Sequence, residues 1–229
     1  RAAEASLRRL QTDVIDLYQL HAFDEESPLE ETLRALEDLV RGGKVRYIGC
    51  SNFRAWELAQ ALGVSQRLGL TRFDSVQPRY NVLHREIETE LLPLCRDEGV
   101  GAIVYNPLAG GMLTGKHAPG AAPAADGRFG DRMGETADTY RRRYWRDEAL
   151  AAVAELKAFF DRRGKPLATV AVAWVLQQPG ISAAIVGASR AEQLEATLSA
   201  GAMTFDDEER SALDEVWYRL PRQRPAAGP

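Results

Sequence analysis

The stretch VIDLYQLHAFDEESPLEETLRALEDLVRGGKVRYIGCSN, residues 14–52, contains a complete strand–helix–strand unit. An apolar run over 14–20 predicts a buried strand, and Ser27 followed by Pro28 is typical of a helix start. Apolar residues recurring every three or four positions give this helix one buried stripe, and a Gly-Gly pair ends it. A second strand follows at 45–50. This order predicts two parallel strands joined by a crossover helix.

The same alternation continues along the chain, after a first segment that has the pattern of a helix end. Further strands are expected at 73–77, 100–105 and 182–187, and further helices at 54–68, 85–98, 147–163, 166–176, 191–198 and 206–216. Between the fourth strand and the helix at 147 lies a long connection with a Pro/Gly/Ala-rich loop. Strands alternating with helices imply a parallel sheet, either an open doubly wound sheet or a (β/α)8 barrel. Periodicity alone does not separate these two folds.

Every predicted strand is followed by polar or glycine residues that a core would not select. These residues are His21, Ser51, Asn52, Gln77, Tyr105, Asn106 and the run from Gly187 to Ser189. In a parallel barrel the carboxyl ends of the strands meet on the face where barrel enzymes build their active sites. The shared direction of these five ends therefore indicates one ligand-binding face.

Each of these residues also has a structural interpretation. His21 can be a hydrogen-bonded structural histidine as well as a catalytic one. Ser51 and Asn52 can cap the helix that follows them, and Tyr105 can belong to the core. Gln77, at the end of a buried strand, needs partners that a ligand amide or a neighbouring strand can supply.

The run GGMLTGK over 110–116 matches the spacing of a nucleotide-hydrolase phosphate loop, but its context does not. His117 replaces the Ser or Thr that would hold magnesium, and a loop follows instead of a helix. A phosphate-holding loop of another kind remains open, because glycines let backbone N–H groups approach an anion and Lys116 adds charge. The chain has no G-x-G-x-x-G fingerprint, so a Rossmann dehydrogenase is not supported.

The run YRRRYWR over 140–146 alternates arginine with aromatic residues. It suits single-stranded nucleic acid, a solvated helix start, or a lid over an anionic cofactor or substrate. The net charge of −4 favours the solvated helix and argues against nucleic acid or an acidic membrane surface. No apolar run approaches the roughly 20 residues of a membrane span. Cys50 and Cys95 are too few for a disulfide framework or a metal site, which favours a reducing cytoplasm.

The blocks DVIDLYQLH, GKVRYIGCSNF, VQPRYN, VYNPLAGGMLTGKH and AIVGASRAEQLEA resemble the aldo-keto reductases, in order and over essentially the whole chain. The segments NPLAGGMLTGKH, GRFG and TYRRRYW are most similar to the aflatoxin-aldehyde/succinic-semialdehyde reductase branch. The resemblance implies an α/β fold, a (β/α)8 TIM barrel that reduces aldehydes or ketones with NADPH and has no Rossmann domain. It also implies that 1–229 form one barrel domain with about five β/α units, lacking the first three strand units.

The resemblance assigns roles around the reacting end of the cofactor. It makes His21 the histidine that orients or polarises the substrate carbonyl, and it places Tyr140 against the substrate. Tyr105 stacks on the nicotinamide ring. The residues implied to bind the nicotinamide carboxamide, and so to fix which face delivers hydride, are Ser51, Asn52 and Gln77.

Further residues are implied along the rest of NADPH. The stretch 106–117 is implied to wrap the pyrophosphate, with Lys116 as the cation. The cofactor-binding residues of this stretch are Asn106, Pro107, Leu108, Gly110, Gly111, Leu113, Thr114, Gly115 and Lys116. Those that reach the cofactor phosphates are Arg128 and Arg143, and those at the adenosine end are Ser189, Arg190, Gln193 and Thr197. Gly187 is also implied to bind the cofactor. An arginine near a 2′-phosphate favours NADPH over NADH, because a guanidinium makes bidentate contacts with it.

Two departures from the family pattern stand out. Ala196-Thr197 replaces the Glu-Asn pair usual near the adenine. The family's catalytic aspartate, tyrosine and lysine are expected upstream of His21, in roughly 100 further residues of a typical barrel. The alternative function is a non-catalytic NADPH-binding regulatory subunit of the same fold. The expected partner is a small aldehyde or ketone, without nucleic acid or membrane, and the physiological substrate and oligomeric state are left open.

Overall fold

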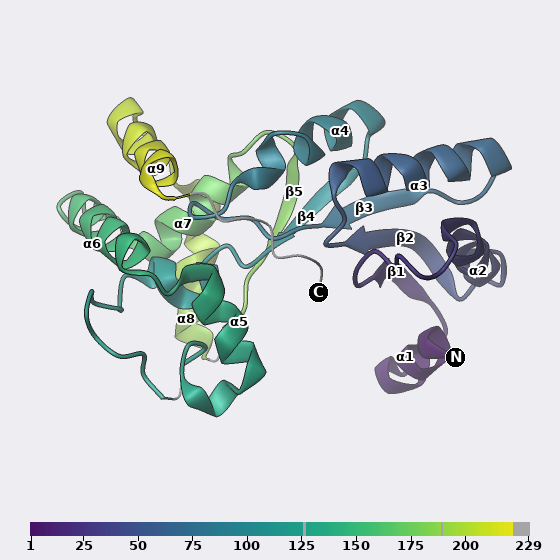
Figure 1. The fold of residues 1–229 in the computed structure, drawn as a ribbon, viewed down its shortest axis with the longest axis horizontal. Helices are drawn as coiled ribbons and strands as arrows, with labels where there is room; N and C mark the ends of the chain where they lie inside the picture. The colour runs from purple at the N-terminus through teal and green to yellow at the C-terminus, as the bar shows by residue number, and fades with distance from the viewer. Residues whose placement is uncertain (126, 189, 222–229) are drawn as a thin grey trace. The chain divides into compact units, whose positions relative to one another are not determined.

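The computed structural model describes residues 1–125, 127–188 and 190–221, and its elements follow the predicted alternation (Figure 1). The strands are β1 Ile15–Leu20, β2 Val45–Ser51, β3 Phe73–Gln77, β4 Gly101–Tyr105 and β5 Ile181–Ile185. The α-helices are α1 Ala2–Leu10, α2 Leu29–Arg41, α3 Ala55–Leu68, α4 Leu91–Glu98, α5 Glu135–Tyr144, α6 Asp147–Asp161, α7 Leu167–Leu176, α8 Ala191–Leu198 and α9 Asp207–Arg219. Short 3-10 helices are η1 Glu86–Glu88, η2 Ala109–Thr114, η3 Asp131–Met133 and η4 Ser199–Ala202.

The strand order separates the two folds that periodicity left open. The sheet has the order β1-β2-β3-β4-β5, and β1 to β4 pair parallel to one another. A doubly wound sheet reverses its strand order at a switch point, whereas a barrel adds each new strand beside the previous one. The five-stranded α/β sheet is therefore consistent with part of a (β/α)8 barrel.

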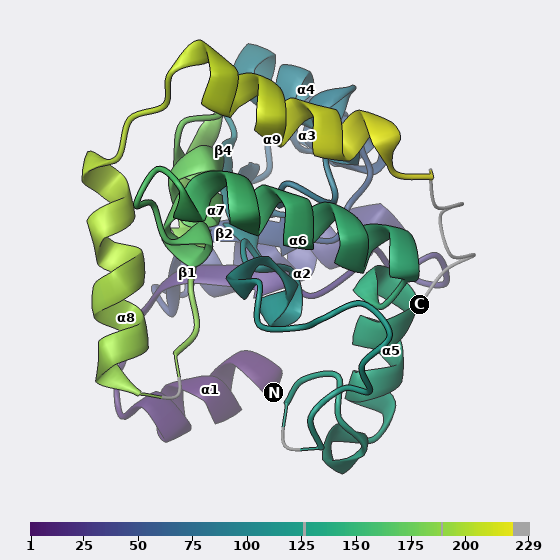
Figure 2. The same ribbon diagram turned by 90° about the vertical axis from the view of Figure 1, so that its left-hand side faces the viewer.

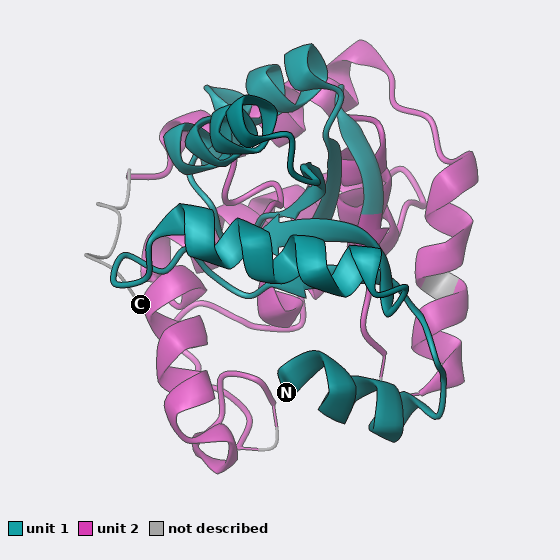
Figure 3. Ribbon diagram, turned by 90° about the vertical axis from the view of Figure 1, so that its right-hand side faces the viewer, with its two compact units in different colours: residues 1–79, 86–105, 179–183 teal, residues 80–85, 106–178, 184–229 magenta. Residues whose placement is uncertain are grey.

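The chain divides into two compact units (Figure 3). Unit 1 comprises residues 1–79, 86–105 and 179–183, and includes β1 to β4 with α1 to α4. Unit 2 comprises residues 80–85, 106–178 and 184–229, and includes α5 to α9. The organisation of 1–229 as a single barrel domain stays a prediction.

The core of unit 1 lies between the strands and helices α2, α3 and α4. Leu33 of α2 and Leu58 of α3 are fully buried, with Ile48 and Phe73 from the strands. Burying one such side chain stabilises the fold by about 1.5–3 kcal/mol relative to leaving it exposed. The predicted apolar stripe of α2 is thus confirmed as the face that covers the sheet.

The single helix predicted over 85–98 is wrong. The segment forms η1 and, after a break, α4 from Leu91. Pro93 explains the break, because a proline ring clashes with the carbonyl group four residues earlier, which here belongs to Thr89. Pro93 fits only within the first turn of a helix that begins at Leu91.

The long connection after β4 contains a helix that the sequence did not predict clearly. Helix α5 has few apolar residues, of which Ala137 and Tyr144 are buried. The arginine run lies in the last turn of α5 and not at a helix start. The helix dipole favours positive charge in this last turn. Arg141 donates to the carbonyl of Phe129 at 2.6 Å and pairs with Asp131, so part of this run is used inside the protein.

Unit 2 has a helical core of its own. Helices α6 and α9 run side by side, and α7 lies among the other helices of the unit (Figures 1 and 2). Helix α7 is apolar on all sides, with Val170, Ala171 and Val175 fully buried. A helix of this kind is stable only inside a core, which fits its position.

Candidate cofactor site

Hydrogen bonds join the polar residues at the ends of β1 to β4 in unit 1. The side-chain amide of Asn52 donates to the carbonyl of His21 at 2.9 Å and to Ser51 Oγ at 3.1 Å. The Tyr105 hydroxyl donates to Asn52 Oδ1 at 2.8 Å, and the Ser51 hydroxyl donates to the carbonyl of Gln77 at 2.7 Å. The predicted meeting of these four strand ends is confirmed.

Asn52 is the centre of this group, and its backbone is specialised for the position. Its φ of 58° is left-handed, a conformation that Asn tolerates better than most residues, and its N–H donates to the carbonyl of Gln77 at 3.2 Å. The capping interpretation of Ser51 and Asn52 is wrong. Helix α3 begins at Ala55, and its start is held by the Glu57 carboxylate, which accepts from the N–H of Arg54 at 2.7 Å.

The exposure of this group suits a bound ring with an amide substituent. Asn52 and His21 are exposed, Gln77 and Tyr105 are half-buried, and Ser51 is buried. Among the described residues the side-chain amide of Gln77 has no hydrogen-bond partner. An amide offers both a donor and an acceptor, which is the complement of a carboxamide. Tyr105 adds an aromatic face held in place by its bond to Asn52.

In unit 2 the loop from Asn106 to Gly115 folds on itself. Asn106 has a left-handed φ of 66°, and its Oδ1 accepts from the N–H of Gly110 at 2.7 Å. The N–H groups of Gly111 and Gly115 donate to the carbonyls of Leu108 and Met112. The three glycine N–H groups that we expected to approach an anion are therefore used within the loop, and the exposed Lys116 remains as its cation.

The other predicted residues of this loop have supporting positions. Pro107 and Leu113 are buried and anchor the loop to the core of unit 2. Thr114 donates its hydroxyl to the carbonyl of Gly111 at 2.8 Å. These contacts shape the loop and leave open space where a side chain on Gly111 would lie.

Three predicted residues from separate segments meet around Arg128. Its Nη1 donates to the Tyr140 hydroxyl at 3.0 Å, and its guanidinium lies 5.5 Å from the centroid of that ring. Its Nη2 lies 3.7 Å from the position that a Cβ on Gly187 would take. The glycine leaves its backbone open to a ligand, and the guanidinium beside it can pair with a phosphate group. Arg143 is half-buried in the last turn of α5, and its role at the phosphates stays a prediction.

The residues predicted at the adenosine end lie at and along α8. Ser189 is outside the described residues. Arg190 and Gln193 are exposed, so they can face a ligand. Thr197 is only 8% exposed and its hydroxyl donates back to the carbonyl of Leu194 at 2.9 Å, which makes it the least accessible of the set.

His117, the last residue of the stretch that the resemblance places around the pyrophosphate, lies in an aromatic cluster. Its ring centroid is 5.2 Å from that of Phe129 and 4.9 Å from that of Trp145, both in edge-on geometry. Its Nε2 is buried without a partner among the described residues. Burial, followed by the charge of Lys116, lowers the pKa of His117 below 6.5. Both aromatic neighbours follow His117 in sequence, by 12 and 28 residues, so no local pattern predicts this packing.

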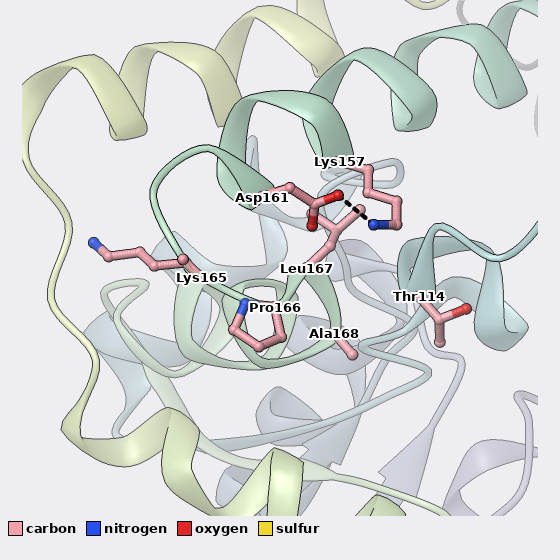
Figure 4. Close-up of a pocket in the computed structure, with 8 residues that line it drawn as sticks. Thr114, Lys157, Asp161, Lys165, Pro166, Leu167 and Ala168 are labelled. Atoms are coloured by element: carbon pink, nitrogen blue, oxygen red, sulfur yellow. Dashed lines mark hydrogen bonds and ion pairs between the residues drawn. The ribbon is translucent and has the colours of Figure 1, made fainter.

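A hollow of about 270 Å³ lies at the start of α7 in unit 2 (Figure 4). Among the described residues, Thr114 is the only predicted site residue that lines it. Lys157 pairs with Asp161, and Lys165 pairs with Glu209 at 2.6 Å. Because both cations already have carboxylate partners, this hollow is not a candidate phosphate site.

Over residues 1–125, 127–188 and 190–221, no group of three or more His, Cys, Asp or Glu side chains is placed to hold a metal ion. In the same described part of the chain, no helix has the length and apolar character needed to cross a membrane.

Comparison with known proteins places the chain in a family. The model of the Aldo/keto reductase family matches residues 1–218. "Uncharacterized oxidoreductase YrpG" of Bacillus subtilis is 36% identical over 217 residues, which are 95% of this chain and 63% of that protein. Human "Aldo-keto reductase family 7 member A3" is 35% identical over 97% of this chain and 70% of that protein. An Arabidopsis thaliana "Probable voltage-gated potassium channel subunit beta" is 37% identical over 86% of this chain and 59% of that protein.

The chain thus spans about three fifths of the length of several curated relatives that it matches. Human "Aflatoxin B1 aldehyde reductase member 2" is 36% identical over 97% of the chain, which agrees with the branch suggested by the sequence blocks. Sequence blocks, sequential parallel strands and the family match all agree: the chain belongs to the aldo-keto reductase family.

Proposed function

We propose that this protein, in its full length, is a cytoplasmic NADPH-dependent reductase that converts small aldehydes or ketones to alcohols. The observation that carries the proposal is the group of His21, Ser51, Asn52, Gln77 and Tyr105 at the ends of neighbouring strands. The side chains of Ser51, Asn52 and Tyr105 bond to one another and to the backbone carbonyls of His21 and Gln77 at 2.7–3.1 Å, so the four strand ends are held together. Relatives that are named aldehyde reductases support the same reaction class.

The residues present fit NADPH, which supplies the hydride when it is bound. In unit 1, the amide of Gln77, which has no partner among the described residues, complements the nicotinamide carboxamide, and the Tyr105 ring supplies a stacking face. In unit 2, Lys116 and Arg128 supply positive charge for phosphates, and Arg190 is exposed at the start of α8. Arginine pairs with a 2′-phosphate in bidentate geometry, which supports NADPH over NADH.

In this proposal His21 binds the substrate carbonyl. The side chain of His21 is exposed, while its backbone carbonyl is fixed by Asn52, so the imidazole projects from a held position. A hydrogen bond from the imidazole to the carbonyl oxygen would stabilise the negative charge that develops there as hydride arrives. Tyr140, with its hydroxyl bound by Arg128, is the proposed contact for the rest of the substrate.

The test is turnover by the full-length gene product with NADPH and a panel of small aldehydes and ketones. We expect loss of NADPH absorbance that depends on the carbonyl compound. Gln77→Ala should raise the KM for NADPH roughly 2- to 13-fold, since one hydrogen bond contributes about 0.5–1.5 kcal/mol. Gln66→Ala, at an exposed position of α3, is the matched control and should leave the KM unchanged.

Two outcomes would contradict the proposal in different ways. A protein that binds NADPH but turns over no carbonyl compound would support the regulatory alternative instead. A protein that neither binds nor oxidises NADPH would contradict the cofactor assignment itself.

A further inference from the structure

Asn81 is a fully buried polar residue to which the sequence assigned no role. It lies between apolar neighbours, Tyr80 and Val82, that are also fully buried. Its side-chain amide donates to the carbonyl of Asn106 and to the Tyr144 hydroxyl oxygen, both at 3.0 Å. Its Oδ1 accepts from the N–H of Leu83 at 3.0 Å. A buried amide is stable only when its donors and acceptor are used in this way.

The two groups that Asn81 binds are themselves joined at the start of the candidate phosphate loop. The amide of Asn106 donates to the Tyr144 oxygen at 3.0 Å, and its Oδ1 accepts from the N–H of Gly110 at 2.7 Å. The carbonyl of Asn106 accepts from the N–H of Ala109 as well as from Asn81. Asn106 is therefore bound through both its side chain and its backbone while it holds a left-handed φ of 66°.

The segment that carries Asn81 is anchored to the helical core of unit 2. Tyr80 packs on Trp174 of α7 with ring centroids 5.2 Å apart. The guanidinium of Arg85 lies 4.9 Å from the same Trp174 ring and pairs with Asp214 of α9. The segment 80–85 thus contacts two helices, and Asn81 in this segment donates a hydrogen bond to the carbonyl of Asn106.

We infer that Asn81 and Tyr144 are positioning residues for the candidate pyrophosphate loop, 106–115. They hold Asn106 in the strained conformation that begins the loop, and so set the path of the backbone from Gly110 to Gly115. The inference rests on the proposed function, because the loop leads directly into Lys116, which is offered there as a cation for the NADPH phosphates. Neither residue is offered as a contact of the cofactor.

The residue types at both positions can be tested with nearly isosteric changes. Asn81→Asp keeps the shape and the acceptor for Leu83 but removes both donated hydrogen bonds. Tyr144→Phe keeps the ring and removes the oxygen that accepts from two amides. Tyr218→Phe is the matched control, because Tyr218 is 70% exposed on α9.

The experiment titrates the full-length wild-type protein and each variant with NADPH and, separately, with adenosine 2′-monophosphate, which lacks the pyrophosphate. Thermal unfolding of each apo protein gives the folded fraction. We expect Asn81→Asp and Tyr144→Phe to raise the Kd for NADPH about tenfold to a hundredfold, because each leaves buried polar groups without a partner. The Kd for adenosine 2′-monophosphate should stay within about twofold, and Tyr218→Phe should change neither value.

The outcomes are distinguishable. NADPH affinity within about twofold of wild type in both folded variants overturns the inference and leaves the proposed function intact. Equal weakening of both ligands, or loss of cooperative unfolding in both variants, shows a general structural role and also overturns it. A wild-type protein without NADPH affinity overturns the proposed function together with this inference.

Discussion

Gly110→Ala tests the packing of the candidate phosphate loop against α5. Gly110 has a left-handed φ of 71°. A Cβ at this position would lie 2.5 Å from Cδ1 and 2.8 Å from Cε1 of Tyr140, closer than real Cβ atoms approach ring carbons. It would also lie 3.4 Å from Cζ of Phe129. The ring of Tyr140 therefore has to move if alanine is introduced.

The expected loss of stability caused by Gly110→Ala has two parts. An alanine in the left-handed region costs about 1–2 kcal/mol, and overpacking a buried contact costs typically about 1–3 kcal/mol. Gly110→Ala should therefore lower the free energy of unfolding by about 2–5 kcal/mol. Gly111→Ala measures the cost of the backbone conformation alone. Gly111 has a φ of 101°, but no atom lies within 4 Å of the point where a Cβ would lie.

The assay is equilibrium urea unfolding of the full-length protein, with each glycine variant made in the wild-type and Tyr140→Ala backgrounds. Removing the Tyr140 ring should restore about 1–3 kcal/mol to Gly110→Ala. Gly111→Ala should instead be additive with Tyr140→Ala within about 0.5 kcal/mol. If Gly110→Ala has the same effect in both backgrounds, the contact between the loop and Tyr140 does not exist as described.

Three further predictions concern stability measured by urea unfolding, and two of them concern its dependence on pH. Hydrogen bonds from Thr71, and then from Arg41, lower the pKa of Glu37 to about 2, so its contribution is present above pH 4.5 and is lost as the pH falls toward 2. Glu37→Gln should remove roughly 1.5–3 kcal/mol at neutral pH, and this difference should shrink through that window; a difference independent of pH would contradict it. Because partial burial, followed by the charge of Lys116, holds the pKa of half-buried His117 below 6.5, the unfolded chain takes up that proton first, and stability should decrease as the pH falls below 6.5. His117→Phe should abolish this part of the acid loss, and an unchanged pH profile would refute the assignment. Gly63→Ala, in the interior of α3 with open space around it, should stabilise by about 0.5–1 kcal/mol, whereas destabilisation would show that the space is filled.

Local patterns were sufficient for the strands and for the residues at their ends. The position of Ser51 or Gln77 at the carboxyl end of a strand follows from the length of the apolar run before it. Parallel pairing then brings these ends together, as the register Ser51 to Gln77 shows. The continuous helix expected over 85–98 is wrong because apolar spacing carries no information about the steric effect of Pro93 on the turn before it.

Contacts between distant segments could not be predicted in this way. Asn81 is separated from Asn106 by 25 residues and from Tyr144 by 63, and no periodic pattern relates them. The one local signal was an asparagine inside a short apolar segment, which implies a buried and fully bonded amide. His117 shows the same limit, since its aromatic neighbours come from segments beyond the loop.

The measurement that tests the central claim most directly follows deuterium from NADPH into the product. The full-length protein is incubated with an aldehyde and NADPH that carries deuterium on one face of nicotinamide C4, and then with NADPH labelled on the other face. If Ser51, Asn52 and Gln77 fix the ring as proposed, the alcohol carries deuterium on the former carbonyl carbon from one labelled form and none from the other. Deuterium from both forms would contradict the fixed ring, and an alcohol without deuterium from either form would contradict hydride transfer from NADPH.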